Sequence, residues 1–183
     1  MASTPVTDYR VLAALAHPLR RRLLDVLRVH GPCTVTLLAG HTGSAVGNVS
    51  HHVRVLAGLG LVVEAPELAR DARERWWRAG AGALRWDVRD VADDPAAATA
   101  AQAVMQLGLE RQVGLVRQSL AAAPSGGDGF NTDAWMTLSA DELTGLGEQV
   151  TALVSRWRER TVPVDGVERT PVFVLARGFP ATP

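Results

Sequence analysis

The first 80 residues carry short apolar stripes in an order that few folds can accommodate, four helical stripes followed by two strand-like runs. Residues 8–30 predict two helices separated at Pro18, because proline fits the first turn of a new helix and cannot continue an old one. Residues 35–40 and 45–58 predict a third and a fourth helix, and Gly43 lies in the short turn between them. This order indicates a helix-turn-helix arrangement.

Two strands are predicted directly after the fourth helix, over residues 62–66 and 73–78. The polar residues 67–72 between them predict the tip of a hairpin. A helix-turn-helix followed by such a hairpin, or wing, is an architecture whose second helix can enter the major groove of DNA. The sequence therefore predicts a mainly α (α+β) chain that begins with a winged helix-turn-helix domain over residues 1–92.

The predicted helix over residues 45–58 has two contrasting sides when its residues are placed 100° apart. We expect the apolar side to pack inward, and it consists of Val46, Val49, Val53 and Leu56. The opposite side carries no carboxylate, and it consists of Ser44, Gly47, Asn48, Ser50, His51 and Arg54. Such a surface can approach phosphates and base edges without charge repulsion. The alternative interpretation is a polar stripe that only faces solvent.

Charge is distributed unevenly along the chain, although 19 basic and 19 acidic residues give a net charge of zero. Residues 1–80 contain ten arginines and six acids, a balance of +4, and the remaining 103 residues have a balance of −4. All five histidines lie between His17 and His52. This asymmetry favours a polyanionic partner for the first part of the chain alone, with a merely solvated basic surface as the alternative.

Three segments of the first 80 residues carry a common pattern, and they are residues 15–27, LAHPLRRRLLDVL, residues 48–62, NVSHHVRVLAGLGLV, and residues 73–78, RERWWR. Together they resemble the ArsR-type winged-helix transcription regulators. The first segment resembles the opening of that family, the second its recognition helix and the exit into the wing, and the third its second wing strand. The resemblance covers about residues 8–80, and it implies a homodimeric transcription regulator, usually a repressor, that binds double-stranded DNA.

The resemblance also assigns roles to individual residues. Positions that face DNA on the recognition helix of the family correspond to Ser44, Asn48, Ser50, His51 and Arg54. Wing positions, where phosphate or minor-groove contact is expected, correspond to Arg70, Arg73 and Arg75. A single recognition helix reads few bases, so we expect a homodimer on a palindromic operator with half-sites about one helical turn apart.

Other residues of this region have structural interpretations. His52 lies close to the apolar side of its helix, and we expect it to be packed and hydrogen-bonded. Trp76 and Trp77 point to opposite faces of a strand, so one of them should fill the core. The arginines at 20–22 could contact phosphates, but three neighbouring arginines more often form a solvated surface.

Neither a metal site, a cofactor nor catalysis is predicted. Cys33 is the single cysteine and has no Cys-x-Cys partner, so we expect a small buried side chain, with metal or thiol sensing through Cys33 as an alternative. The sequence contains neither a glycine-rich phosphate loop nor a nucleophile elbow, which argues against an enzyme. A protein–protein interaction module that uses the same helix and hairpin is a further alternative.

Asp93-Asp94-Pro95 predicts the start of a long helix over residues 93–123, followed by a flexible linker at 125–129. One apolar stripe runs along this helix, and it consists of Met105, Leu109, Val113, Val116 and Leu120. We expect the stripe to be the dimerisation seam. Packing of the stripe against the C-terminal unit of the same chain is the alternative.

Residues 124–183 predict a small α/β unit, in which strands at 135–138 and 172–175 flank a helix that opens with a capping box at 139–142. Pairing of these strands within or between chains is left open. An effector site for a small apolar ligand is predicted in this unit, lined by Trp135, Met136, Trp157 and Phe173. The alternative is that these side chains form the core of the unit.

No apolar run approaches the roughly 18 uninterrupted residues that a membrane span needs. The N-terminus also lacks the basic-then-apolar layout of a secretory signal. We therefore expect a cytoplasmic protein without a membrane partner.

Overall fold

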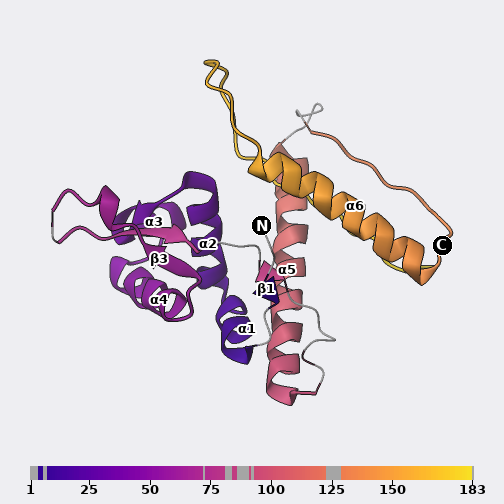
Figure 1. Cartoon of the computed structure of the whole chain (residues 1–183), viewed down its shortest axis with the longest axis horizontal. Coiled ribbons are helices and arrows are strands. Elements are labelled where there is room, and N and C mark those ends of the chain that lie inside the picture. Colours follow the sequence, from indigo (N-terminus) through magenta and orange to yellow (C-terminus); the bar gives the residue numbers. More distant parts are fainter. Residues whose placement is uncertain are drawn as a thin grey trace. The chain divides into compact units, whose positions relative to one another are not determined.

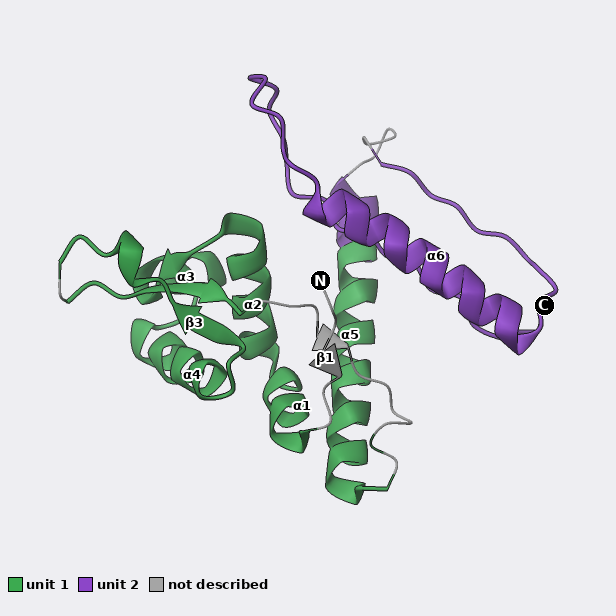
Figure 2. Cartoon of the chain, viewed as in Figure 1, with its two compact units in different colours: residues 1–116 green, residues 117–183 purple. Residues whose placement is uncertain are grey.

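The structure is a computed structural model, and it describes residues 4–5, 8–71, 73–80, 84–85, 91, 93–122 and 129–182. The chain divides into two units, residues 1–116 and residues 117–183 (Figure 2). The boundary between them falls inside the long helix α5.

Four helices build the first part of unit 1, and they are α1 (Tyr9–Leu15), α2 (Pro18–His30), α3 (Val35–Thr42) and α4 (Val46–Gly58) (Figure 1). The four helices predicted from the apolar stripes are thereby confirmed. Side chains of the preceding residues cap three of them, since Asp8, His17 and Thr34 accept backbone hydrogen bonds from the first turns of α1, α2 and α3.

A three-stranded antiparallel sheet follows these helices, in the order β2-β4-β3. The strands are β2 (Cys33–Thr34), β3 (Val62–Glu64) and β4 (Trp76–Ala79), and a short 3₁₀ helix, η1 (Pro66–Leu68), follows β3. The predicted hairpin is confirmed as β3 and β4, with Val63 paired to Arg78. Gly80 is required at the end of β4, because a Cβ there would lie 2.4 Å from the carbonyl oxygen of Gly60.

A second, two-residue pairing joins β1 (Thr4–Pro5) to β5 (Leu84–Arg85) in parallel. The long helix α5 (Pro95–Ala122) begins as predicted, because the Asp94 carboxylate accepts hydrogen bonds from the backbone of Ala96 and Ala97.

The core of unit 1 lies between the helices and the sheet. Its largest fully buried side chains are Leu12, Leu23, Leu24, Leu38, Leu56, Val49, Val53 and Val62. Helix α5 adds small residues to this core through Ala97, Ala101 and Val104. An ion pair between Arg111 and Asp25, 2.9 Å apart, further connects α5 to α2.

Unit 2 contains α6 (Ala140–Glu159), whose predicted capping box is confirmed, since Ser139 and Glu142 exchange side-chain-to-backbone hydrogen bonds. The strands predicted at 135–138 and 172–175 are not formed, because no part of 129–139 or 160–182 pairs as a strand. An apolar run supplies strand propensity but needs a partner edge to become a strand. In the described residues of unit 2, every side chain is at least partly exposed.

In the part of the chain that the structure describes, no helix is long and apolar enough to cross a bilayer. The linker predicted at 125–129 lies almost entirely outside the described residues.

Candidate nucleic-acid interface

The turn between α3 and α4 determines how α4 is presented. Gly43 ends α3 with a φ of +63°, a left-handed conformation that glycine adopts without steric cost. Ala45 then returns to an extended conformation and provides no side-chain cap, so the first amides of α4 have no side-chain partner. Uncapped amides at a helix N-terminus are suitable donors for an anion such as phosphate.

The inner face of α4 packs into the core as predicted for three of its four apolar residues. Val49, Val53 and Leu56 are fully buried. Val46 was also expected inside, but this expectation is wrong, because its side chain is 51% exposed. The Cα–Cβ bonds of a helix tilt toward its N-terminus, so the side chain of the first residue leans beyond the packed length of the helix.

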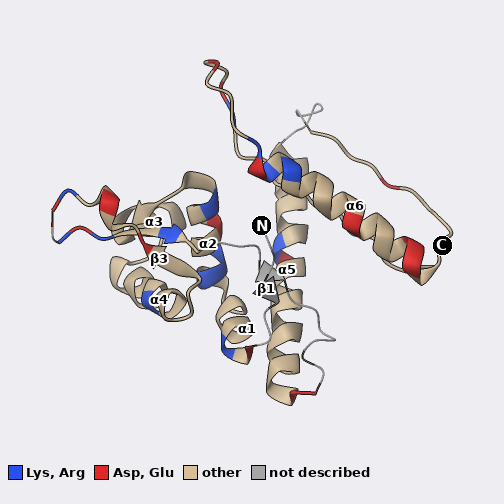
Figure 3. Cartoon of the chain, viewed as in Figure 1, with Lys and Arg blue, Asp and Glu red and all other residues tan. Residues whose placement is uncertain are grey.

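The opposite side of α4 is open, and we call it the open face, formed by Ser44, Asn48, Ser50, His51 and Arg54. The side chains of Asn48, His51 and Arg54 are exposed, whereas Ser44 and Ser50 are half-buried. The guanidinium of Arg54 donates a hydrogen bond of 3.0 Å to the hydroxyl of Ser50. Helix α4 carries no acidic residue (Figure 3). The structure thus places four of the residues that the sequence singled out on this side of α4, and Ser44 lies in the turn just before the helix.

The wing presents arginines on the loop between β3 and β4. Arg70, Arg73 and Arg75 are all exposed. The guanidinium of Arg75 lies 3.4 Å from the carboxylate of Glu64, whereas no ion pair of Arg70 or Arg73 occurs among the described residues. Arg75 is therefore partly neutralised, which the sequence alone does not indicate.

Two acids organise the backbone of the wing loop. One carboxylate oxygen of Asp71 accepts hydrogen bonds from the amides of Arg73 and Glu74, at 2.7 and 3.0 Å. The carboxylate of Glu74 accepts a hydrogen bond of 2.8 Å from the amide of Arg70. These acids give the loop a defined shape, and they also offset part of the positive charge of its arginines.

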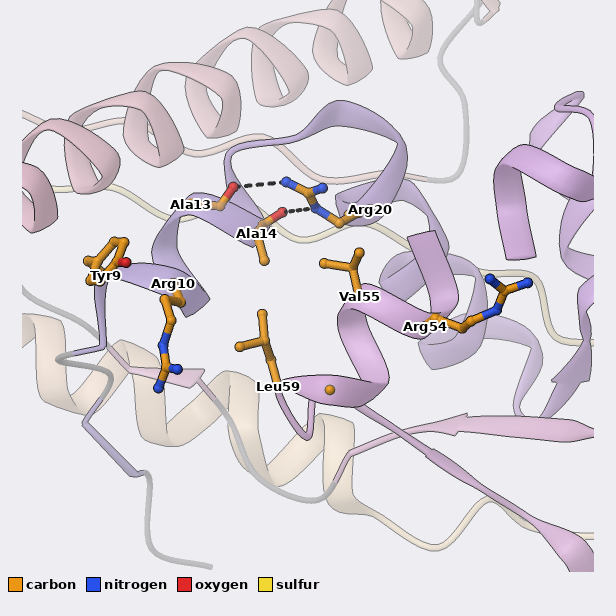
Figure 4. Close-up of a pocket in the computed structure, with 9 residues that line it drawn as sticks. Tyr9, Arg10, Ala13, Ala14, Arg20, Arg54, Val55 and Leu59 are labelled. Carbon is orange, nitrogen blue, oxygen red and sulfur yellow. Dashed lines mark hydrogen bonds between the residues drawn. The ribbon is translucent and has the colours of Figure 1, made fainter. Parts of the chain in front are cut away.

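Two of the three arginines at 20–22, Arg20 and Arg22, have internal partners that the sequence did not reveal. Arg20 donates hydrogen bonds of 2.6 and 3.0 Å to the carbonyl oxygens of Ala14 and Ala13, at the end of α1 (Figure 4). Arg22 donates to the backbone carbonyl of His41 at 3.3 Å. These two side chains connect α2 to α1 and to α3.

A groove of about 460 Å³ lies between α1 and α4 (Figure 4). Its lining residues are mostly apolar apart from three arginines, and they are Tyr9, Arg10, Ala13, Ala14, Arg20, Arg54, Val55, Gly58 and Leu59. The arginines do not converge on it: Arg10 pairs with Asp8, Arg20 binds the carbonyls of α1, and Arg54 points toward Ser50.

Two further sequence predictions concern buried aromatic side chains. Trp77 is buried and Trp76 is half-buried, so one tryptophan fills the core as expected. His52 is buried, as predicted, with 7% of its surface exposed. Its expected hydrogen bond is not found at Nδ1, which has no partner among the described residues.

Cys33 lies in β2 and is 3% exposed, and burial raises the pKa of its thiol. A raised pKa keeps the thiol protonated and disfavours both metal binding and oxidation. Over the described ranges, no three or more His, Cys, Asp or Glu side chains are grouped so that they could hold a metal ion.

The residues predicted to bind an effector are surface residues of unit 2. Trp135, Met136, Trp157 and Phe173 are all exposed, and none of them lines the groove between α1 and α4. The side chains of the α5 stripe are likewise exposed, from 39% at Val113 to 73% at Leu120.

Comparison with known proteins identifies a helix-turn-helix domain at residues 15–65, which span α2, α3, α4 and β3. No curated protein matches the sequence. A possible transcriptional regulator for arsenical resistance, known from its crystal structure, is 28% identical in sequence to this chain. The alignment covers 66% of this chain and 100% of the regulator, at a TM-score of 0.33. The adhesin competence repressor of Streptococcus pyogenes is 13% identical in sequence. That alignment covers 77% of this chain and 81% of the repressor chain, also at a TM-score of 0.33.

Proposed function

We propose that the chain is a sequence-specific DNA-binding transcription regulator of the ArsR type, in which α4 is the recognition helix. The observation that carries the proposal is the open face of α4, which is exposed, free of acids and part of a helix-turn-helix domain. A helix with these properties can enter the major groove, where DNA is densely lined with phosphates.

The residues of the open face suit two kinds of contact. The amide of Asn48 and the guanidinium of Arg54 have the donor and acceptor patterns that read adenine and guanine edges. The hydroxyls of Ser44 and Ser50 and the uncapped amides of α4 suit phosphate oxygens, which fix the position of the helix. His51 is exposed between these groups and can donate to either.

The wing supplies a second contact on the duplex. Arg70 and Arg73 offer guanidiniums to the backbone or the minor groove, and Arg75 can join them after exchanging Glu64 for a phosphate. An exposed ion pair of this kind contributes at most about 1 kcal/mol, so the exchange costs little.

We further propose a homodimer that represses transcription from a palindromic operator in the cytoplasm and is released by a small-molecule effector. The exposed apolar stripe on α5 supports the dimer, because a second copy of the chain would remove it from water. The exposed aromatic side chains of unit 2 support an effector site for a small apolar ligand. No catalytic role is proposed.

Selection of bound duplexes from a random pool tests the proposal. We expect an enriched palindrome whose half-sites are about one helical turn apart. Affinity for this duplex should fall steeply with added salt, because binding displaces counterions from the phosphates. Absence of any enriched sequence, together with salt-independent retention of protein partners, would indicate an interaction module instead.

A further inference from the structure

Two histidine rings meet where the junction of α1 and α2 packs against α4. His17 is the N-cap of α2, and its ring centroid lies 4.4 Å from that of His52 on α4, with an interplanar angle of 42°. The ring of His51 lies edge-on to His52 at 5.2 Å. We refer to His17 and His52 as the histidine pair.

His17 caps α2 only in its neutral form. Its Nδ1 accepts a hydrogen bond of 3.2 Å from the amide of Leu19, which is the first available donor because Pro18 has no amide hydrogen. A ring nitrogen that accepts a hydrogen bond carries no proton. Protonation of Nδ1 would therefore remove the cap and leave two donors, the Nδ1–H of His17 and the amide of Leu19, facing each other.

His52 is also placed where a proton is unfavourable. Its Nδ1 is buried and has no hydrogen-bond partner within the described part of the chain. Outside the pair, the charged or titratable groups that act on it are Arg20 on α2 and His51 on α4, and the ring of His51 contacts that of His52. Among the described residues, no carboxylate contributes to the pKa shift of either imidazole.

The electrostatics agree with this geometry. Burial lowers the pKa of His52 below its ordinary value of 6.5, and the nearby His17, Arg20 and His51 lower it further. Burial, Arg20 and His51 likewise lower the pKa of His17. Arg20 remains in place because the carbonyl oxygens of Ala13 and Ala14 bind its guanidinium.

We infer that His17 and His52 are positioning residues for α4, and that mild acidification weakens the packing of α4 against α2 and so lowers affinity for the operator. The DNA part of this inference rests on the proposed function, whereas the effect on α4 concerns the folded chain alone. Protonation weakens this packing in two ways. It removes the hydrogen bond that caps α2, and it puts charge into a contact that is made between two neutral rings.

The direction of the pH effect follows from the lowered pKa values. As the pH falls through 6.5, the unfolded or opened chain takes up protons that the packed histidine pair resists. The free energy of unfolding therefore decreases below this pH, until the pKa of the packed pair is itself reached. At higher pH both rings are neutral and the contribution of the pair is complete.

The test compares three forms of the full chain at about pH 7.5 and about pH 5.5, on either side of the ordinary histidine pKa. The first is the wild type and the second is the double variant His17→Asn with His52→Leu, in which asparagine keeps an N-cap acceptor and leucine keeps an apolar contact. The matched control is His41→Gln, which removes a histidine stacked on His30 at 4.2 Å, away from the pair.

Hydrogen exchange of the α4 amides, corrected for intrinsic pH dependence, and operator affinity are measured on each form. We expect the protection of α4 and the affinity of the wild type and of His41→Gln to fall several-fold at the lower pH. In the double variant the protection of α4 should stay nearly constant, and the operator affinity should no longer fall at the lower pH. If the double variant does not fold, His17→Asn alone should remove part of the pH effect while retaining the cap.

Equal pH dependence of α4 protection in all forms would overturn the inference, as would opening of α4 without loss of operator affinity. A chain that binds no duplex at any pH, but whose α4 opens on acidification only when the histidine pair is intact, would retain the inference for α4 and refute the proposed function. The two failures are therefore distinguishable.

Discussion

Arg54 and Arg20 illustrate how differently two arginines of the same domain are used. Arg20 is held by two backbone carbonyls of α1, so it is part of the structure. Arg54 makes one exposed hydrogen bond to Ser50, a contact that contributes on the order of 1 kcal/mol. Arg54 can therefore leave Ser50 and reach a base edge or a phosphate at small cost.

Arg54→Ala should weaken binding to the selected operator by roughly tenfold or more, because a bidentate contact of arginine with guanine contributes about 1–3 kcal/mol of discrimination. The melting temperature should change little, since the side chain is exposed. Arg117→Ala, which removes an exposed arginine from α5, is the matched control. Equal operator affinity of Arg54→Ala and the control, measured by fluorescence anisotropy, would remove Arg54 from the interface.

Glu64→Gln tests the partial neutralisation of the wing. Loss of the carboxylate frees Arg75 and removes a negative charge near the phosphates, so affinity for all duplexes should rise by a similar factor. The effect should be largest at low salt. The matched control is Glu110→Gln, an equivalent change on α5, which should leave DNA affinity unchanged. A Glu64→Gln variant that binds DNA with the affinity of the wild type would argue against contact by this side of the wing.

At the scale of the elements, one buried apolar stripe holds α4 in place, and this stripe does not extend into the first turn of the helix. Val49, Val53 and Leu56 contribute fully buried apolar surface, whereas Val46 contributes little. The helix begins without a side-chain cap, so its position depends on this stripe and on the histidine contact. The open face is thereby held toward solvent by packing on the other side.

Val49→Ala and Val46→Ala form a matched pair on the same helix. Truncation of the buried Val49 should reduce the free energy of unfolding by about 2 kcal/mol through lost burial and the cavity left behind. Val46→Ala should change it by less than about 0.5 kcal/mol. Urea denaturation of both variants gives the comparison, and equal losses would mean that the inner face of α4 is wrongly assigned.

The sequence predicted the helices and the wing because their information is local. Apolar stripes, proline and glycine determine helix boundaries within a few residues, and the residues of the open face follow from helical periodicity. Strand β2 was missed because its two residues pair with Trp76 and Trp77, far along the chain, and such pairing leaves no local signal. The strands at 135–138 and 172–175 were wrongly predicted for the same reason.

Contacts between side chains were also beyond prediction. The internal bonds of Arg20, the pairing of Arg75 with Glu64 and the unpartnered Nδ1 of His52 depend on which elements become neighbours. The spacing of residues in the sequence gives the direction in which these side chains point, but it does not give their hydrogen-bond or ion-pair partners.

At the scale of the whole molecule, apolar surface on α5 remains exposed. The residues of its stripe face solvent, while the neighbouring Ala97, Ala101 and Val104 pack into unit 1. Exposed apolar stripes of this length are a common feature of interfaces. A second copy of the chain is the partner that the proposed palindromic operator requires.

Leu109→Glu should shift the chain from dimer to monomer, because a carboxylate in the stripe would be buried without a partner on association. Gln118→Glu places the same charge on an exposed polar position of α5 and should leave the dimer intact. Sedimentation velocity gives the mass of each form. Monomeric wild type, or a dimer that tolerates Leu109→Glu, would contradict the assigned seam.

The central claim, that α4 lies in the major groove with its open face against the bases, is tested most directly by cleavage from a tethered reagent. Cys33 is buried, so a cysteine introduced at the exposed Val46 can be labelled selectively with an iron chelate. The account predicts strand cleavage at two places in the selected operator, about one helical turn apart, and none from a chelate at Gln118 on α5. A bound operator that is cut from position 118 and left intact from position 46 would contradict it.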